Sequence, residues 1–220
     1  MKEIPEGIAT EWLGILFLLI IAALTWVRFN YSKRFQQLFS AAINQRLMRQ
    51  LMRQELVFSH RASIVLTIVF LFSLSAFLYV ADTMFQWNIL ASSGFILWAK
   101  YLLLLFLIYF VKLLAIEWVK LMSDGDFSLG EYEYDIFLIN KASGLLILPF
   151  AMLGAYLFKS QAEVIIIIGL VLLVSLFFYR WIRGLGNAIR LHVPVFYIIL
   201  YFCTLEILPL AILQRVLTLG

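Results

Sequence analysis

Apolar residues in this chain gather in six long runs, and the segments between the runs hold most of its charges. The runs cover residues 12–27, 63–80, 95–116, 136–158, 164–179 and 195–213. Each is close to the roughly 20 residues that a helix needs to cross the hydrocarbon of a bilayer. Because the runs are continuous and do not alternate in polarity, they predict transmembrane helices and not the strands of a membrane barrel. The pattern therefore predicts an all-α, polytopic bundle with about six spans.

Composition supports this interpretation. Hydrophobic residues make up 64% of the 220 residues and charged residues only 14%, and the mean hydropathy is +0.99. These values lie far outside the range of soluble domains. Six spans and short connections use up the length, so residues 1–220 are predicted to form a single integral membrane domain. The net charge of +4 comes from basic residues that flank the runs, which indicates contact with anionic lipid headgroups and not with nucleic acid.

Basic residues are concentrated in two of the connections. They follow the first run at Arg28, Lys33, Arg34, Arg46, Arg49, Arg53 and Arg61, and the fifth run at Arg180, Arg183 and Arg190. Lysine and arginine near span ends favour the cytoplasmic side of a membrane. Both connections are therefore predicted to be cytoplasmic, and with six spans both termini are predicted to lie on the opposite side.

Two of the predicted connections have a distinctive composition. Residues 35–58 mix apolar and basic positions and predict an amphipathic helix between the first and second spans, lying along the inner leaflet. The connection 122–135 is acidic, but it lacks the spacing of a calcium loop and has no histidine nearby. It is predicted to be a solvated loop, and neither a metal site nor a cofactor is predicted.

The charge placed deepest in an apolar run is Glu206, near the middle of the last run. A charge at the centre of a bilayer costs roughly 2.5–3.5 kcal/mol on insertion scales, so Glu206 is expected to face the bundle interior. Lys100 in the third run has a long side chain and is its predicted partner. The pair could be structural packing or a working group such as a proton relay.

Other candidate residues lie near the span ends. Lys112, Glu117 and Lys141 are predicted to be secondary intramembrane charges. Arg180 and Arg183 lie one helical turn apart, where a lipid phosphate could bind between them, or where they could serve only as a positive anchor on the cytoplasmic side.

Prolines and small residues shape the predicted helices. Pro149 and Pro209 are each predicted to kink a helix, because proline removes a backbone hydrogen-bond donor. Small residues in the fourth span, which would let another helix approach closely, are Gly144, Ala151, Gly154 and Ala155. Gly184 and Gly186 are expected to form a sharp connection after the fifth span.

The clearest motifs lie in the C-terminal third, at Phe178-Tyr-Arg180-Trp-Ile-Arg183-Gly184 and in residues 196–209, which include Glu206 and Pro209. With these motifs the chain resembles a Bacteroidota integral membrane family of unknown function, domain-of-unknown-function 4271. The resemblance covers the chain from the second span onward. It implies an inner-membrane location, with both predicted termini then periplasmic, and it implies no activity, substrate or cofactor.

No catalytic constellation is visible: the two histidines, His60 and His192, are far apart in sequence, and no nucleophile motif lies within a run. The leading hypothesis is a non-enzymatic inner-membrane protein that binds lipid and other membrane proteins or itself, as a subunit or accessory factor of an envelope assembly. The alternative is a proton- or solute-translocating protein that uses Glu206 and Lys100. A weaker alternative is a membrane enzyme acting on lipid headgroups.

Overall fold

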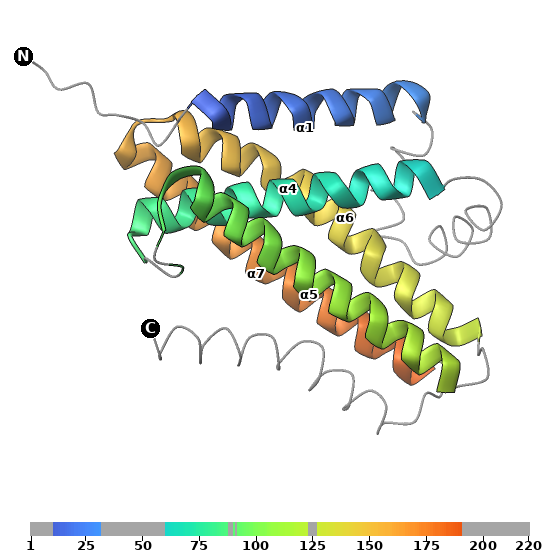
Figure 1. The fold of residues 1–220 in the computed structure, drawn as a ribbon. Helices are drawn as coiled ribbons and strands as arrows, with labels where there is room; N and C mark the ends of the chain where they lie inside the picture. The colour runs from blue at the N-terminus through green and yellow to red at the C-terminus, as the bar shows by residue number, and fades with distance from the viewer. Residues whose placement is uncertain (1–10, 32–59, 88–89, 91, 123–126, 191–220) are drawn as a thin grey trace, which may run out of the picture.

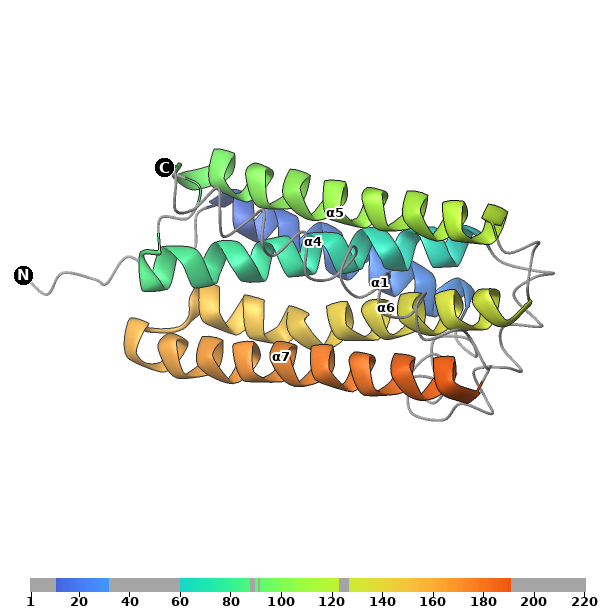
Figure 2. The same ribbon diagram turned by 90° about the horizontal axis from the view of Figure 1, so that it is seen from below.

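The computed structural model describes residues 11–31, 60–87, 90, 92–122 and 127–190, and nearly all of these residues lie in helices. The helices are α1 (Glu11–Asn30), α4 (His60–Phe85), α5 (Gly94–Met122), α6 (Phe127–Tyr156) and α7 (Lys159–Arg190). They lie side by side and alternate in direction along the chain (Figures 1 and 2). One end of the bundle therefore holds the starts of α4 and α6 together with the last turns of α1, α5 and α7.

Each of these helices contains a stretch long and apolar enough to cross a membrane. The stretches are Glu11–Asn30, Ser63–Phe85, Gly94–Leu114, Phe137–Tyr156 and Lys159–Arg183. They confirm the prediction of a helical bundle with several helices that could cross a membrane. The sixth predicted run, 195–213, and the predicted amphipathic segment, 35–58, lie outside the described residues, so the sixth span and the interfacial helix stay predictions.

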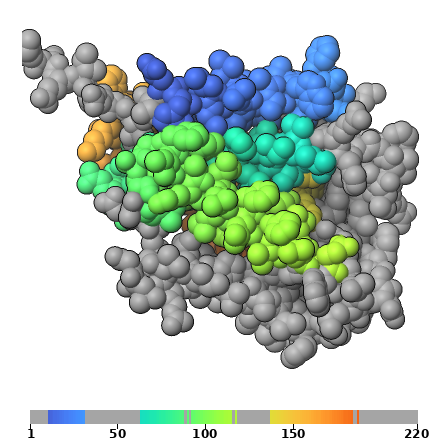
Figure 3. Space-filling view, in the orientation of Figure 1, coloured from blue at the N-terminus to red at the C-terminus, as the bar shows by residue number. Residues whose placement is uncertain are grey.

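Helix α4 forms the centre of the described bundle. It packs most extensively against α6 and also contacts α1, α5 and α7. Its spanning segment is 56% buried, whereas those of α5 and α7 are each 17% buried. In the space-filling view α1 and α5 cover α4, and only a strip of α4 shows between them (Figure 3). The core thus lies along α4 and along α6, whose spanning segment is likewise 56% buried.

Small residues allow α6 and α7 to approach their neighbours closely. A Cβ atom at Gly144 of α6 would lie 2.6 Å from the Cα atom of Phe70 in α4. At Gly154 of α6 it would overlap the Ile166 side chain of α7. Ala151 and Ala155 of α6 are completely buried. The prediction that these small residues of the fourth span permit close helix packing is confirmed.

The predictions for two connections are wrong in part, because helices extend into these segments. Residues 127–135 of the predicted acidic loop are helical and begin α6, which is consistent with the absence of proline there and with the helix propensity of glutamate. Gly184 and Gly186 lie inside α7 and do not form a turn. A glycine lowers helix propensity by about 1 kcal/mol but leaves helical dihedral angles accessible, so it does not by itself end a helix.

Helix α4 also continues beyond its predicted end at Val80, to Phe85. Asp82 therefore belongs to a membrane-spanning helix and not to a connecting loop. Pro149 lies inside α6, while Pro209 lies outside the described residues, so both kinks stay predictions.

The close approach of α4 and α6 gives a direct test. Replacing Gly144 with alanine should lower the free energy of unfolding by about 1–3 kcal/mol, because the added methyl group overlaps the backbone at Phe70. The matched control is Gly186→Ala, at an exposed helical glycine with no atom within 4 Å of its Cβ position. The control should be neutral or slightly stabilising, because alanine favours a helix. Thermal unfolding in detergent measures the stability of both variants. Equal Tm values for Gly144→Ala and the wild type would contradict the close packing of α4 and α6.

Candidate functional site

Charged and polar side chains are buried at both ends of the apolar bundle. Those that are at most 8% exposed are Ser73, Ser75, Asp82, Lys112, Asn140, Lys141 and Arg183. Burying a charge or a polar group in an apolar surrounding is unfavourable unless partners compensate it. These residues therefore mark the places where the structure departs from simple apolar packing.

Most of them lie at one end, which we call the basic end and define by Ser63, Lys112, Asn140, Lys141, Arg180 and Arg183. Its best-defined contact joins α7 to α6. The Arg180 Nη1 atom donates a hydrogen bond of 3.1 Å to the Asn140 Oδ1 atom. The guanidinium carbon of Arg180 also lies 4.8 Å from the centroid of the Phe177 ring, within cation–π range.

A cavity of about 100 Å³ adjoins this contact. Arg180, Asn140 and Ser143 contribute to its wall. The Ser143 hydroxyl donates a hydrogen bond to the backbone carbonyl oxygen of Asn140. The remaining lining residues are mainly apolar and come from three helices: Phe70 and Leu74 of α4, Ile139, Gly144 and Ile147 of α6, and Leu173, Leu176 and Phe177 of α7. The cavity therefore combines an apolar wall with one guanidinium and one carboxamide group.

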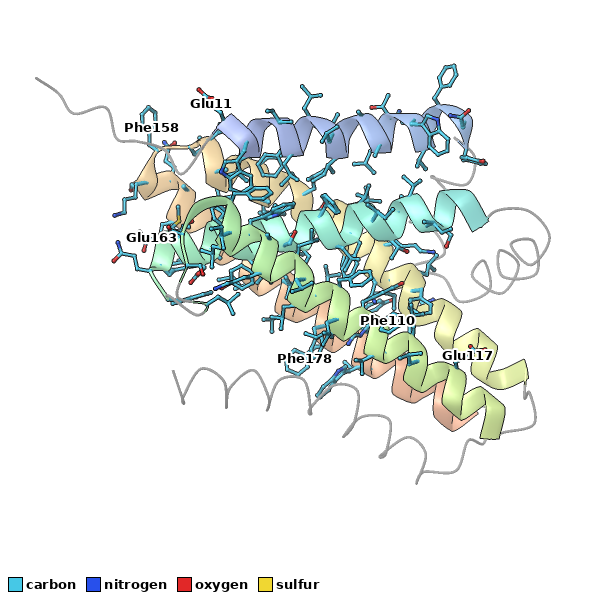
Figure 4. The ribbon with its side chains drawn as sticks, viewed as in Figure 1. Glu11, Phe110, Glu117, Phe158, Glu163 and Phe178 are labelled. Atoms are coloured by element: carbon cyan, nitrogen blue, oxygen red, sulfur yellow. The ribbon has the colours of Figure 1, made fainter. Side chains whose placement is uncertain are left out.

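A second polar contact at the basic end joins α6 to α4. The Lys141 ammonium group donates a hydrogen bond of 2.6 Å to the Ser63 hydroxyl, and Lys141 is buried. One turn after Arg180, Arg183 is also buried, and its Nη1 atom donates to the Tyr179 hydroxyl at 3.3 Å. Lys112 of α5 is buried as well, whereas Glu117 of α5 is exposed and lies toward the same end of the bundle (Figure 4).

Lys100 lies toward the opposite end, near the start of α5, and it is exposed. Its ammonium group donates to the Leu90 carbonyl oxygen at 3.1 Å and also contacts the Ser92 hydroxyl, so it binds the segment just before α5. Glu206 lies outside the described residues, and the Lys100–Glu206 pair stays a prediction.

Sequence reasoning missed Asp82, because hydropathy placed it in a connection. The side chain is 3% exposed, and the Tyr101 hydroxyl of α5 lies beside its carboxyl group. Asn140 was missed too, since an asparagine in an apolar run carries no charge to draw attention. The apolar residues that follow Asp82, Met84 and Phe85, could have indicated that the helix continues.

The described residues form no cluster of metal ligands. Among the described residues, no three histidine, cysteine, aspartate or glutamate side chains come together in a group that could hold a metal ion. The chemistry available at the basic end is instead the binding of an anion by guanidinium and amide groups.

Comparison with known proteins adds one match. The model of a family described as "Domain of unknown function (DUF4271)" matches residues 13–217, a range that includes every helix described above apart from the first two residues of α1. No curated protein and no solved structure matches the chain.

The contact between α6 and α7 can be tested by a double-mutant cycle. Asn140→Leu and Arg180→Met should each lower stability, and their effects should depart from additivity by about 0.5–3 kcal/mol, because the two side chains share a hydrogen bond. As a control, Asn140→Leu is combined with Arg28→Met, at an exposed arginine of α1, and these effects should add. Thermal unfolding in detergent gives the four values of each cycle, and additivity of the Asn140–Arg180 cycle would contradict the contact.

Proposed function

The chain belongs to the family described as "Domain of unknown function (DUF4271)", and on this premise we propose that it is a non-enzymatic protein of the cytoplasmic membrane that binds anionic lipid. In this proposal the basic end of the bundle lies at the cytoplasmic leaflet and the N- and C-termini are periplasmic. The lipid-bound protein serves as a subunit or accessory factor of an envelope assembly.

The cavity beside Arg180 is the observation that carries the proposal. A phospholipid combines an anionic headgroup with apolar chains, and the cavity combines the guanidinium of Arg180 with a wall of leucine, isoleucine and phenylalanine side chains. Arginine binds phosphate through several donors in a fixed planar arrangement. Asn140 holds the guanidinium at the cavity, so the cationic group is already positioned before a phosphate arrives.

The charge distribution supports the proposed orientation. Arg28, in the last turn of α1, lies at the same end as Lys141, Arg180 and Arg183, and the cytoplasmic leaflet carries anionic lipids that attract such residues. The exposed carboxylates Glu11 and Glu163 lie at the other end (Figure 4).

The outward faces of α5 and α7 support a role beside other membrane proteins. Large apolar side chains exposed there include Leu103, Phe106 and Leu107 of α5, and Val171, Phe178 and Ile182 of α7. In a bilayer such faces contact either lipid tails or the helices of a neighbour. The proposed assembly would use part of this surface.

Lipid binding is tested by native mass spectrometry of the detergent-purified protein with added phosphatidylglycerol or phosphatidylcholine. The wild type should retain phosphatidylglycerol preferentially, and Arg180→Gln should weaken its binding about tenfold, equivalent to about 1.4 kcal/mol, because a charge-assisted contact to phosphate is lost. Arg28→Gln removes the same charge from the exposed surface of α1 and should leave binding nearly unchanged. Equal retention by Arg180→Gln and the wild type would overturn the proposed lipid site.

The assembly role is tested by crosslinking in native membranes. A photoreactive amino acid placed at Phe106, on the exposed face of α5, should give a discrete crosslinked species above the monomer mass. The control position is Phe77 of α4, which is completely buried and should give no intermolecular product. Monomer alone from several exposed positions on α5 and α7 would contradict the assembly role while leaving the lipid site untouched.

A further inference from the structure

Asp82 is an acidic side chain held inside the membrane-spanning part of the bundle. It lies in the last turn of α4, is 3% exposed, and belongs to the apolar stretch Ser63–Phe85. An ionised carboxylate in such surroundings requires compensation by a cation or by hydrogen bonds. Intramembrane carboxyl groups are for this reason candidates for function.

The surroundings of Asp82 provide little compensation. The Tyr101 hydroxyl of α5 lies near the carboxyl group. Within the part of the chain that the structure describes, neither Asp82 Oδ1 nor Tyr101 Oη meets the ordinary geometric limits of a hydrogen bond. Tyr101 itself is 4% exposed. A buried carboxyl group and a buried phenol thus lie near each other between α4 and α5.

Charged groups on the neighbouring helices are directed elsewhere. Lys100, next to Tyr101 in sequence, binds Leu90 and Ser92 in the segment before α5. The other described ionisable side chains at this end are Tyr79, which is buried on α4, and the exposed Glu11 on α1, Tyr156 on α6, and Lys159 and Glu163 on α7. Among the described residues no lysine, arginine or histidine is recorded as a partner of Asp82.

The surroundings of Asp82 favour a proton over a metal cation as the ligand. Calcium and magnesium need a shell of six or more oxygen ligands, whereas the oxygen group that the described residues place near the carboxyl group is the Tyr101 hydroxyl. A proton needs only one carboxylate oxygen and removes the charge from the apolar surroundings.

We propose that Asp82, with Tyr101 beside it, is a proton-binding site that exchanges protons with water at the end of the bundle where α4 terminates. On uptake, a proton bonds to Oδ1 of the carboxylate, and the neutral acid donates a hydrogen bond to the Tyr101 hydroxyl oxygen. On release, the proton returns to water and Tyr101, which keeps its own proton, donates to the carboxylate. The exit is short, because Asp82 lies within one turn of the helix end.

Infrared spectroscopy of the full-length protein in liposomes tests this site, with spectra recorded from acidic to alkaline pH in buffers of fixed ionic strength. Beside the C=O absorption of the exposed carboxyl groups, the wild type should show a separate high-frequency C=O band, expected of a carboxylic acid in apolar surroundings, whose intensity changes with pH. Asp82→Asn should remove this band. Tyr101→Phe keeps the carboxyl group but removes its partner, so the band should remain and shift in frequency. Glu163→Gln, at an exposed carboxylate of the same end, should leave the band unchanged.

Three outcomes would overturn the proposal. One is a pH-dependent C=O band that persists unchanged in Asp82→Asn. Another is a band in Tyr101→Phe identical in frequency to that of the wild type. The third is a carboxylate signal that responds to exchange of sodium for choline and not to pH, which would identify a metal-cation site instead. Because Tyr101→Phe retains Asp82, the test stands even if Asp82→Asn does not fold, and none of these results depends on lipid binding at Arg180.

Discussion

The arrangement of the helices depends on one steric constraint, the close approach of α6 to α4 at Gly144 and Phe70. A side chain at Gly144 would overlap the backbone of α4, so only glycine lets the two helices touch there. This contact fixes their parallel alignment, which then places Lys141 opposite Ser63 at the basic end. It also positions α6 so that Asn140 faces Arg180 of the following helix. Backbone packing in the middle of the membrane thus determines the polar contacts nearer its surface.

The buried charges of the described bundle differ between its two ends. Cationic side chains at the basic end have hydroxyl, amide and aromatic partners around a small cavity. Asp82, toward the other end, is buried near the Tyr101 phenol. Because apolar packing fills most of the space between, a cation at one end and the carboxylate at the other cannot neutralise each other directly. One end is proposed to bind an anionic headgroup and the other a proton.

Hydropathy predicted much of this fold and less of its chemistry. The existence of the first five spans follows from the apolar runs, since hydrocarbon requires long helices whose backbone groups are bonded internally. The helix ends do not follow, because a charge such as Asp82 ends an apolar run without ending the helix. The contact of Asn140 with Arg180 joins residues forty positions apart, and no local pattern pairs them. Gly144 could be recognised as a packing residue, but its partner Phe70 could not.

The central claim, that α4 and α6 meet at backbone distance inside the membrane, can be tested directly by solid-state nuclear magnetic resonance of the isotopically labelled protein in lipid bilayers. Through-space carbon correlation should give a strong cross-peak between the Cα atoms of Phe70 and Gly144, because the structure leaves no room for a side chain between them. The control is that the same spectra resolve contacts between Gly154 and Ile166. If they do and the Phe70–Gly144 cross-peak is absent, α6 does not pack on α4 as described. The polar contacts of the basic end would then lose their structural explanation.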